Sequence, residues 1–576
     1  MINNKSLNKG ESGKILRLIK GFEKIGLSRD EIYGTIINLG IKGYATPITG
    51  YAYNRLLSNS KKILELEKYK SLIETKIDRT TLEKICFDSH AEKINEIDLI
   101  SEYEKLGIER EFIDCKDTQN LLMAKKIVEE YNFERKLTSR EEKAILRLML
   151  RDASLNQGNK GHISTLVKNL KEIGLDTQEA YGVIMNLSIN TNTKSSKNIG
   201  YSSLLHNRNN VLNLHNDNIE KNVNELSLDI AVMNDLEDDE KKKIVQKYEE
   251  MGIEPECIQK KDIRNLYIAN KIVSEYDFGE EIKIKDKKAI LECILSNSYL
   301  EISQGSQLTV LIKNLYQIGQ KKQEVYGTII NSAINGTAIK RAGYSYSKLI
   351  SSENATIELQ KYKNEIETSV SKMTIKSARA NALTKEESSL LIKSLQELNI
   401  PQEIIENKNI KNLYIAKDIV DSYKFDRDIL RDEKSILICS ILSSSRLNKG
   451  KSSLISLIQE IEKTGLKEQE IYGIILNLAI NGSIAKQKGY GYAELIQKPE
   501  KFQELIEQNT KIETNVTEES IEVARKKSKK IMKKAVKEVK EQGNLEEIPS
   551  TMCELENMAT MEFLKDNPNS THELWK

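Results

Sequence analysis

Three polar positions recur four times in this chain at helical spacing, and they are the first candidates for chemistry. A Glu stands two residues before a Tyr-Gly pair, and an Asn stands five residues after the Tyr. A carboxylate, a phenol and an amide held together could bind a ligand or move a proton. The Glu and Asn of the four copies are Glu31 and Asn38, Glu179 and Asn186, Glu324 and Asn331, and Glu470 and Asn477.

A structural role explains the Glu better than a site does. Ser28 precedes Glu31 by three residues, and Asp176 precedes Glu179 by three, which is the spacing of a capping box. In the other two copies a Lys occupies the cap position, so only the attraction between the carboxylate and the helix N-terminus remains there. The sequence therefore predicts that the Glu residues stabilise helix ends.

The Gly of each Tyr-Gly pair lies inside a predicted helix, where Gly costs about 1 kcal/mol relative to Ala. Its presence in four copies predicts that another helix or loop crosses closely there. The Asn lies one turn further along the same stripe. We expect it to satisfy backbone groups of the loop leading to a later Gly-Tyr pair, with ligand binding as the alternative. The tyrosines of those pairs are expected to pack, and the pairs are Gly50-Tyr51, Gly200-Tyr201, Gly343-Tyr344 and Gly489-Tyr490.

Other chemistry has little support in the residue pattern. The five histidines never form a His-x-x-x-His spacing, and the six cysteines contain no Cys-x-x-Cys pair. Phosphate-binding glycine loops and the nucleophile elbow are also missing from the sequence. We therefore expect no metal, no cofactor and no enzymatic activity.

The elements that carry these residues repeat about every 146 residues. The Tyr-Gly pairs are separated by steps of 148, 145 and 146 residues, and a second type of segment, such as Asn265-Leu266-Tyr267-Ile268-Ala269, occurs three times between them. Such a period is typical of repeat proteins. We predict a first block over 1–89 that is half a module, full second, third and fourth blocks over 90–235, 236–383 and 384–520, and a tail over 521–576.

The repeated segments have the pattern of helices. Asp262 is a good N-cap, and Leu266, Ala269, Ile272 and Val273 follow at helical spacing. Only six prolines occur, and no alternating apolar run indicates a strand. The prediction is an all-α tandem repeat protein, stacked as a solenoid or superhelical array.

The tail carries a basic amphipathic helix between residues 525 and 540, with nine basic residues and one acidic residue. This pattern suits a protein partner or nucleic acid phosphates. Bases also occur in the loops between the repeated pairs. The candidate contacts are Arg525, Lys526, Lys527, Lys529, Lys530, Lys533, Lys534 and Lys537 in the tail, and Lys340, Arg341, Lys486 and Lys488 in the loops.

Four copies without a catalytic pattern favour a non-enzymatic scaffold or adaptor that binds a protein. The alternatives are a nucleic-acid-binding protein that uses the bases named above, and a secreted effector or enzyme with a site in one module. The net charge of +2 supplies no global field towards nucleic acid or membrane. The first residues lack a secretory signal pattern, which predicts a cytoplasmic protein and leaves export as an effector open. The many Ile, Lys and Asn residues suggest an AT-rich genome.

Overall fold

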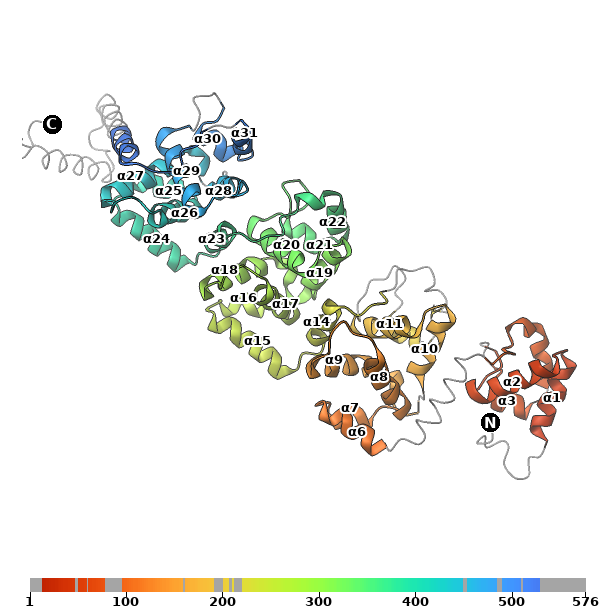
Figure 1. Cartoon of the computed structure of the whole chain (residues 1–576). Helices are drawn as coiled ribbons and strands as arrows, with labels where there is room; N and C mark the ends of the chain where they lie inside the picture. The colour runs from red at the N-terminus through yellow and green to blue at the C-terminus, as the bar shows by residue number, and fades with distance from the viewer. Residues whose placement is uncertain are drawn as a thin grey trace, which may run out of the picture. The chain divides into compact units, whose positions relative to one another are not determined.

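The computed structural model describes residues 13–46, 50–59, 61–77, 96–158, 161–190, 200–206, 210–211, 220–448, 453–483, 489–508 and 511–528 (Figure 1). These residues form helices and no β-strand, with isolated β-bridges in the connecting loops. The predicted all-α class is therefore confirmed. The chain divides into two compact units, Met1–Glu237 and Asp238–Lys576. None of the helices in the described ranges is long and apolar enough to cross a membrane.

The first block forms a core of its own inside the first unit. Leu18 and Phe22 on one helix and Leu39 on the next are buried together with Leu56. The elements are α1 (Lys14–Lys24), α2 (Arg29–Lys42), α3 (Tyr53–Ser58), α4 (Lys61–Glu65) and the 3-10 turn η2 (Leu66–Leu72).

The rest of the first unit is built around the buried helix α9 (Ser139–Leu150). It packs against α8 (Thr118–Glu130), α11 (Thr177–Ile189) and α14 (Glu225–Asn234). The other elements are α6 (Glu96–Lys105), α7 (Arg110–Asp114), η3 (Ala153–Leu155), α10 (His162–Glu172) and α12 (Tyr201–His206).

In the second unit, helices pack around two further buried helices. In the third block α18 (Ile284–Leu295) packs against α17 (Ile263–Glu275), α20 (Lys322–Asn335) and α23 (Lys372–Asn381). The remaining elements of that block are α15 (Asp238–Glu250), α16 (Pro255–Gln259), η5 (Ser298–Leu300), η6 (Ile302–Gln304), α19 (Gln307–Gln317), α21 (Tyr346–Ser351), α22 (Glu353–Glu358) and η7 (Leu359–Glu365).

In the fourth block α27 (Arg431–Leu442) packs against α26 (Ile410–Ser422) and α29 (Glu468–Asn481). The other elements are α24 (Lys385–Glu397), α25 (Gln402–Asn407), η8 (Ser445–Leu447), α28 (Leu454–Glu462), α30 (Tyr492–Gln497), α31 (Lys501–Glu507) and a last helix over 518–528. That last helix crosses the boundary that the sequence predicts after residue 520.

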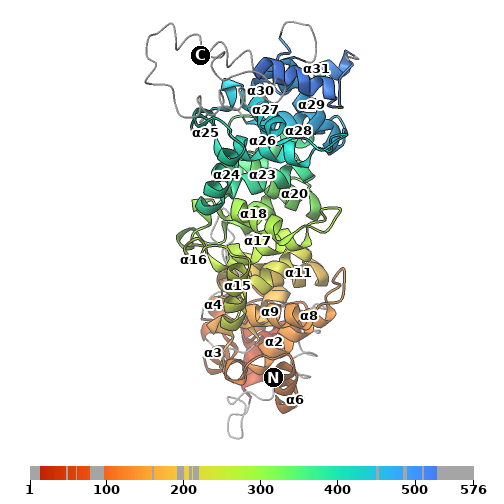
Figure 2. The same cartoon turned by 90° about the vertical axis from the view of Figure 1, so that its left-hand side faces the viewer.

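Helix α23 joins the third and fourth blocks. It packs against α18 and α20 on one side and against α26 and α28 on the other (Figure 2). Met373 and Ala380 of α23 belong to the buried core of the fourth block. The two blocks of the second unit therefore share an apolar interface.

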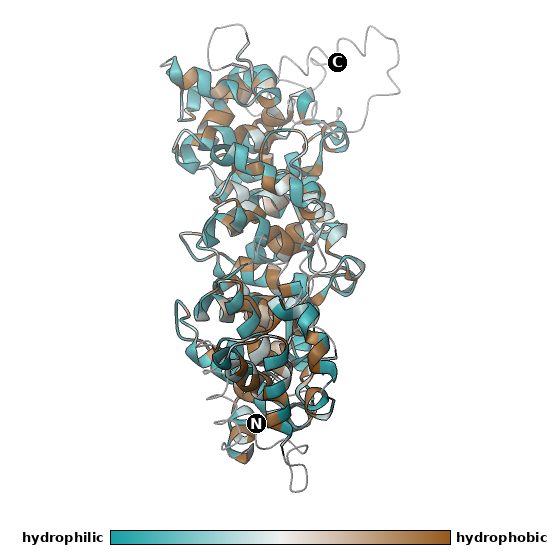
Figure 3. Ribbon diagram, turned by 90° about the vertical axis from the view of Figure 1, so that its right-hand side faces the viewer, coloured by the Kyte–Doolittle hydropathy of each residue, from teal (hydrophilic) through white to brown (hydrophobic). Residues whose placement is uncertain are grey.

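Local sequence accounts for the helix starts. The side chains of Asp117, Asp262 and Asn409 each accept a backbone N–H two residues later, at 3.1, 2.9 and 3.0 Å. The apolar positions predicted for the Asp262 helix are buried in α17. Hydrophobic and hydrophilic residues alternate around the helices (Figure 3), as expected when one face of each helix packs.

Candidate binding surfaces

The four recurring Asn side chains each hold an extended segment across their own helix. Asn38 Nδ2 donates to the carbonyl oxygens of Glu74 and Lys76, at 2.8 and 2.9 Å. The same two bonds, of 2.8–3.1 Å, join Asn186 to Glu220 and Asn222, Asn331 to Glu367 and Ser369, and Asn477 to Glu513 and Asn515. We call this arrangement the Asn clasp. The prediction that the Asn bonds the loop leading to Gly50-Tyr51 is wrong. Its partners, Glu74 and Lys76, belong to a segment that follows that loop in the chain.

The recurring Gly lies under the middle residue of each clasped segment. A Cβ atom added to Gly34 would lie 1.8 Å from the carbonyl oxygen of Thr75. The corresponding distances are 1.7 Å from Gly182 to Lys221, 1.7 Å from Gly327 to Thr368 and 1.6 Å from Gly473 to Thr514. Only Gly fits at this crossing.

Each recurring Glu accepts the backbone N–H of the residue that caps its helix. Glu31 accepts from Ser28 at 2.7 Å, and Glu179, Glu324 and Glu470 accept from Asp176, Lys321 and Lys467 at 3.0, 2.7 and 2.8 Å. The bond from the Ser28 amide lowers the pKa of Glu31. The reciprocal bond comes only from Ser28 and Asp176, because a Lys ammonium cannot accept. The Glu, Gly and Asn of all four copies thus contact their own block's backbone.

The match of Gly200-Tyr201 with the other three Gly-Tyr pairs is wrong. The hydroxyl of Tyr201 donates to the carbonyl of Met149 at 3.1 Å, as Tyr346 and Tyr492 do to Ile294 and Ile441 at 3.0 and 2.9 Å. Tyr201 therefore corresponds to Tyr346, two residues after the Gly343-Tyr344 pair. The backbone agrees, because Gly50, Gly343 and Gly489 are left-handed, with φ of 108°, 97° and 104°, whereas Gly200 is not.

A half-buried polar cluster joins α23 of the third block to the fourth block. Lys376 Nζ of α23 lies 2.8 Å from Asp418 Oδ2 and 2.6 Å from Glu468 Oε1, and Tyr472 donates to Asp418 at 3.0 Å. Burial opposes the ammonium charge, but the two carboxylates outweigh it and raise the pKa of Lys376. Burial also raises the pKa of Tyr472, so neither group is suited to act as a base at neutral pH.

The cavity beside this cluster encloses about 10 Å³ and is lined mostly by apolar side chains, including Met373, Ile415 and Ile458. Such a volume is at the lower limit for a single water molecule. The cluster therefore ties α23 to the fourth block and has no room for a substrate.

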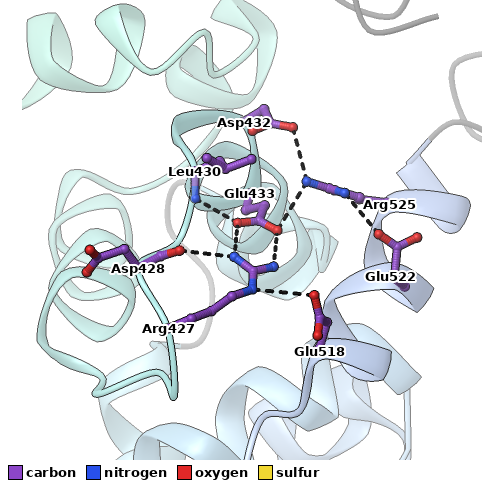
Figure 4. Close-up of polar contacts among 8 residues, drawn as sticks. All are labelled: Arg427, Asp428, Leu430, Asp432, Glu433, Glu518, Glu522 and Arg525. Atoms are coloured by element: carbon purple, nitrogen blue, oxygen red, sulfur yellow. Dashed lines mark hydrogen bonds and ion pairs between the residues drawn. The ribbon is translucent and has the colours of Figure 1, made fainter. Parts of the chain in front are cut away.

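A second cluster attaches the last helix to the fourth block (Figure 4). The carboxylate of Glu433 has no exposed surface and accepts two bonds from Arg427, at 2.8 and 2.6 Å, and one from Arg525, at 3.1 Å. The Leu430 amide adds a fourth bond at 2.6 Å. These bonds, led by those from Arg427, lower the pKa of Glu433 despite its burial.

The same arginines also reach acidic residues on the last helix itself. Arg525 donates to Glu522 at 2.9 Å, and Arg427 Nε lies 3.6 Å from Glu518. Arg525, a predicted partner contact, is thus engaged inside the block.

The other predicted basic contacts are distributed differently. Lys527 Nζ donates to the Ile480 carbonyl, while Lys526 is exposed. Lys340 pairs with Glu460 at 2.8 Å, and Arg341 pairs with Glu365 at 2.7 Å. The basic side chain of each pair is more than half exposed, so each ion pair contributes little to stability. Lys529, Lys530, Lys533, Lys534, Lys537, Lys486 and Lys488 lie outside the described residues.

The third block exposes apolar side chains that the sequence reasoning missed. Tyr299 and Ile302, in the turns between α18 and α19, are 40% and 63% exposed. The second block has Ser154 and Gln157 at these positions, and the fourth has Arg446 at the first. Comparing the blocks position by position in this loop could have found them.

The chain matches no protein family, no curated protein and no solved structure.

Proposed function

We propose that this protein is a non-enzymatic scaffold or adaptor, built from tandem helical blocks of about 146 residues, that binds a protein partner on surfaces where the blocks differ. The Asn clasp carries the proposal. Its Gly and Asn contact backbone of their own block in all four copies, so the repeated residues maintain the framework. Loops on a constant framework are free to differ and to carry binding residues.

The end of the chain's last block supports the tandem arrangement. Met373, Ser377 and Ala380 of α23 are buried, and α23 packs against helices of the fourth block. The corresponding positions of the last helix are Glu519, Val523 and Lys526, of which the two charged residues are exposed. Ile521 and Ala524, which face the block's own core, stay buried like Ile375 and Ala378. A polar outer face on a terminal element is what a repeat array needs in water.

The exposed pair Tyr299 and Ile302 is our first candidate for the partner surface. Aromatic and aliphatic side chains at the centre of an interface supply much of its binding energy. The second and fourth blocks carry polar residues there, so among these three blocks the surface belongs to the third.

Affinity capture with the full chain tests the proposal. We expect a protein that co-purifies in constant ratio, that survives nuclease treatment, and that is lost from the double variant Tyr299→Ser, Ile302→Gln, which installs the second block's residues. The matched control is Leu390→Gln, which removes a similarly exposed apolar side chain from α24. If the double variant still captures the partner, the partner binds another surface. Capture of nothing but nucleic acid would contradict the protein scaffold.

Nucleic acid binding is the competing function, and a gel-shift series separates it. The probe is a 30-base-pair duplex or a single-stranded RNA of equal length, titrated over salt concentration. Phosphate contacts release counterions, so true binding weakens steeply with salt. Replacement of Lys529, Lys530, Lys533, Lys534 and Lys537 by Gln should abolish such binding without disturbing Arg525, which the last helix needs for attachment.

A further inference from the structure

The first block presents a face that is covered in every other block. Helices α1 and α2 correspond to α10 and α11, to α19 and α20, and to α28 and α29. In those blocks the first helix of each pair packs against α8, α17 or α26, and the second packs against α9, α18 or α27. The three covered faces therefore serve as a template for what fits the first.

The apolar side chains of that face show the difference. Tyr33 is 43% exposed, whereas its counterparts Tyr181, Tyr326 and Tyr472 are 3%, 3% and 1% exposed. Leu16 is exposed, while its counterparts Ser164 and Thr309 are buried. Ile15 and Ile37 are half-buried, and their counterparts in the other three blocks are fully buried. The open strip thus runs along both α1 and α2.

Two hydrogen-bonding positions on this face have fixed partners in the other blocks. The side-chain oxygens of Asn120, Asn265 and Asn412 accept the amides of Ile163, Leu308 and Leu454, at 3.2, 3.2 and 3.0 Å. The hydroxyls of Tyr131, Tyr276 and Tyr423 accept the amides of Val223, Val370 and Val516, at 2.9, 2.9 and 3.0 Å. In the first block the corresponding amides belong to Ile15 and Ile77, and α1 has no side-chain cap at Gly13.

The Asn and the Tyr always stand eleven residues apart. The Asn lies in the first turn of the helix, and the Tyr is the C-cap residue that follows its last turn. A partner that completes the first block must carry the same two residues at that spacing, with apolar residues between them.

We infer that the α1–α2 face binds a helix pair of the α8–α9 type supplied by another polypeptide, whose first helix carries Asn and Tyr eleven residues apart. The three pairs of this type among the described residues already cover their own blocks. This inference rests on the proposed scaffold function and names a kind of partner for it.

The test uses the full chain and a labelled peptide of residues 115–151, which contains α8 and α9 and stands in for the partner. We expect saturable binding and a photo-crosslink from the peptide's Tyr131 position to the segment around Ile77. The variant Leu16→Glu, Tyr33→Glu should weaken binding by on the order of 100-fold, because two charges would be buried without partners. The control Leu64→Glu should change nothing, since Leu64 and its counterpart Ile357 are both exposed.

The peptide variant Asn120→Ala, Tyr131→Phe should bind roughly tenfold more weakly or worse, because two backbone amides lose their acceptors. Failure of this peptide and of those of residues 260–296 and 407–443 to bind would overturn the inference. So would binding that the double Glu variant leaves unchanged. Self-association of the full chain that Tyr33→Glu abolishes would identify a second copy as the occupant instead. The capture experiment with Tyr299 and Ile302 is unaffected by these outcomes.

Discussion

Gly327 lies so close to Thr368 that a Cβ atom would sit 1.7 Å from the Thr368 carbonyl oxygen. The obstacle is backbone that Asn331 holds in place from both sides, so a side chain cannot be accommodated by a rotamer change. This contact makes the Tyr-Gly position the least tolerant of the repeated positions.

Gly327→Ala should therefore lower the free energy of unfolding of the third block by roughly 3 kcal/mol or more, because the segment must move away from α20. The urea midpoint and hydrogen exchange of residues 366–370 measure this. Gly336→Ala is the control, since it has a left-handed backbone but nothing within 4 Å of the added atom. It should cost about 1 kcal/mol. Equal effects of the two changes would argue against a rigid crossing.

Asn331→Ala should destabilise the same block by roughly 1–3 kcal/mol, because two carbonyl oxygens lose their donor. Hydrogen exchange should accelerate at residues 366–370 more than at α18. Unchanged stability together with lost partner binding would make Asn331 a ligand contact rather than a clasp.

The sequence predicts local features well and distant partners poorly. The cap at Asp262 and the apolar residues that follow it at spacings of three and four are local features of the sequence. The α17 helix could therefore be predicted without any tertiary contact. The close crossing at Gly327 could be predicted because Gly is costly in a helix. The segment that Asn331 clasps could not be predicted, because it lies 36 residues away, beyond the nearer loop that leads to Gly343-Tyr344.

The other two errors have separate causes. The loop before Tyr201 is as long as its counterpart, since Tyr201 follows Asn186 by 15 residues, as Tyr346 follows Asn331. The second block has Asn198 and Ile199 in the places of Gly343 and Tyr344 and a Gly-Tyr pair two residues later, so matching the pairs by sequence placed Tyr201 out of register. In the sequence Arg525 is one of nine basic residues between 525 and 540, and nothing there indicates a partner. Only the fold brings it to Glu433, 92 residues earlier. Periodicity carries no information about such pairs.

Glu433→Gln should loosen the last helix, because the two guanidinium groups of Arg427 and Arg525 lose their shared charge partner. We expect a cost of about 2 kcal/mol, the order of a hydrogen bond to a charged group. Limited proteolysis within 511–528 gives the readout. The control Glu522→Gln removes only an exposed partner of Arg525 and should have a small effect.

The same cluster predicts a dependence on acid pH. The pKa of Glu433 is lower in the folded protein than in the unfolded chain, where a Glu titrates near about 4.3. Its stabilisation is therefore complete above that value and is lost as the pH falls through the lower, folded pKa. Proteolysis of the last helix should accelerate over this window in the native chain and not in Glu433→Gln.

Lys376→Met should weaken the attachment of α23 to the fourth block, because Asp418 and Glu468 then face each other without the ammonium between them. The expected loss is about 3 kcal/mol, as for one partner removed from a largely buried ion pair.

The effect of Lys376→Met should depend on pH. The folded pKa of Lys376 is raised, so its contribution is complete below the unfolded value and disappears as the pH rises through the folded one. Urea midpoints of native chain and variant should therefore converge at strongly alkaline pH, and parallel curves would contradict the assignment.

Two truncations separate the structural part of the tail from its basic part. A chain that stops at residue 520 loses the buried Ile521 and Ala524 and the Arg525 bond to Glu433. We expect its fourth block to be destabilised by about 3–5 kcal/mol, from the lost apolar burial and the lost charged hydrogen bond. A chain that stops at residue 528 keeps all three contacts and should retain the urea midpoint of the full chain. Only the comparison of this second chain with the full one measures what residues 529–576 contribute to binding. If both truncations unfold at the same urea concentration as the full chain, the last helix does not stabilise the block.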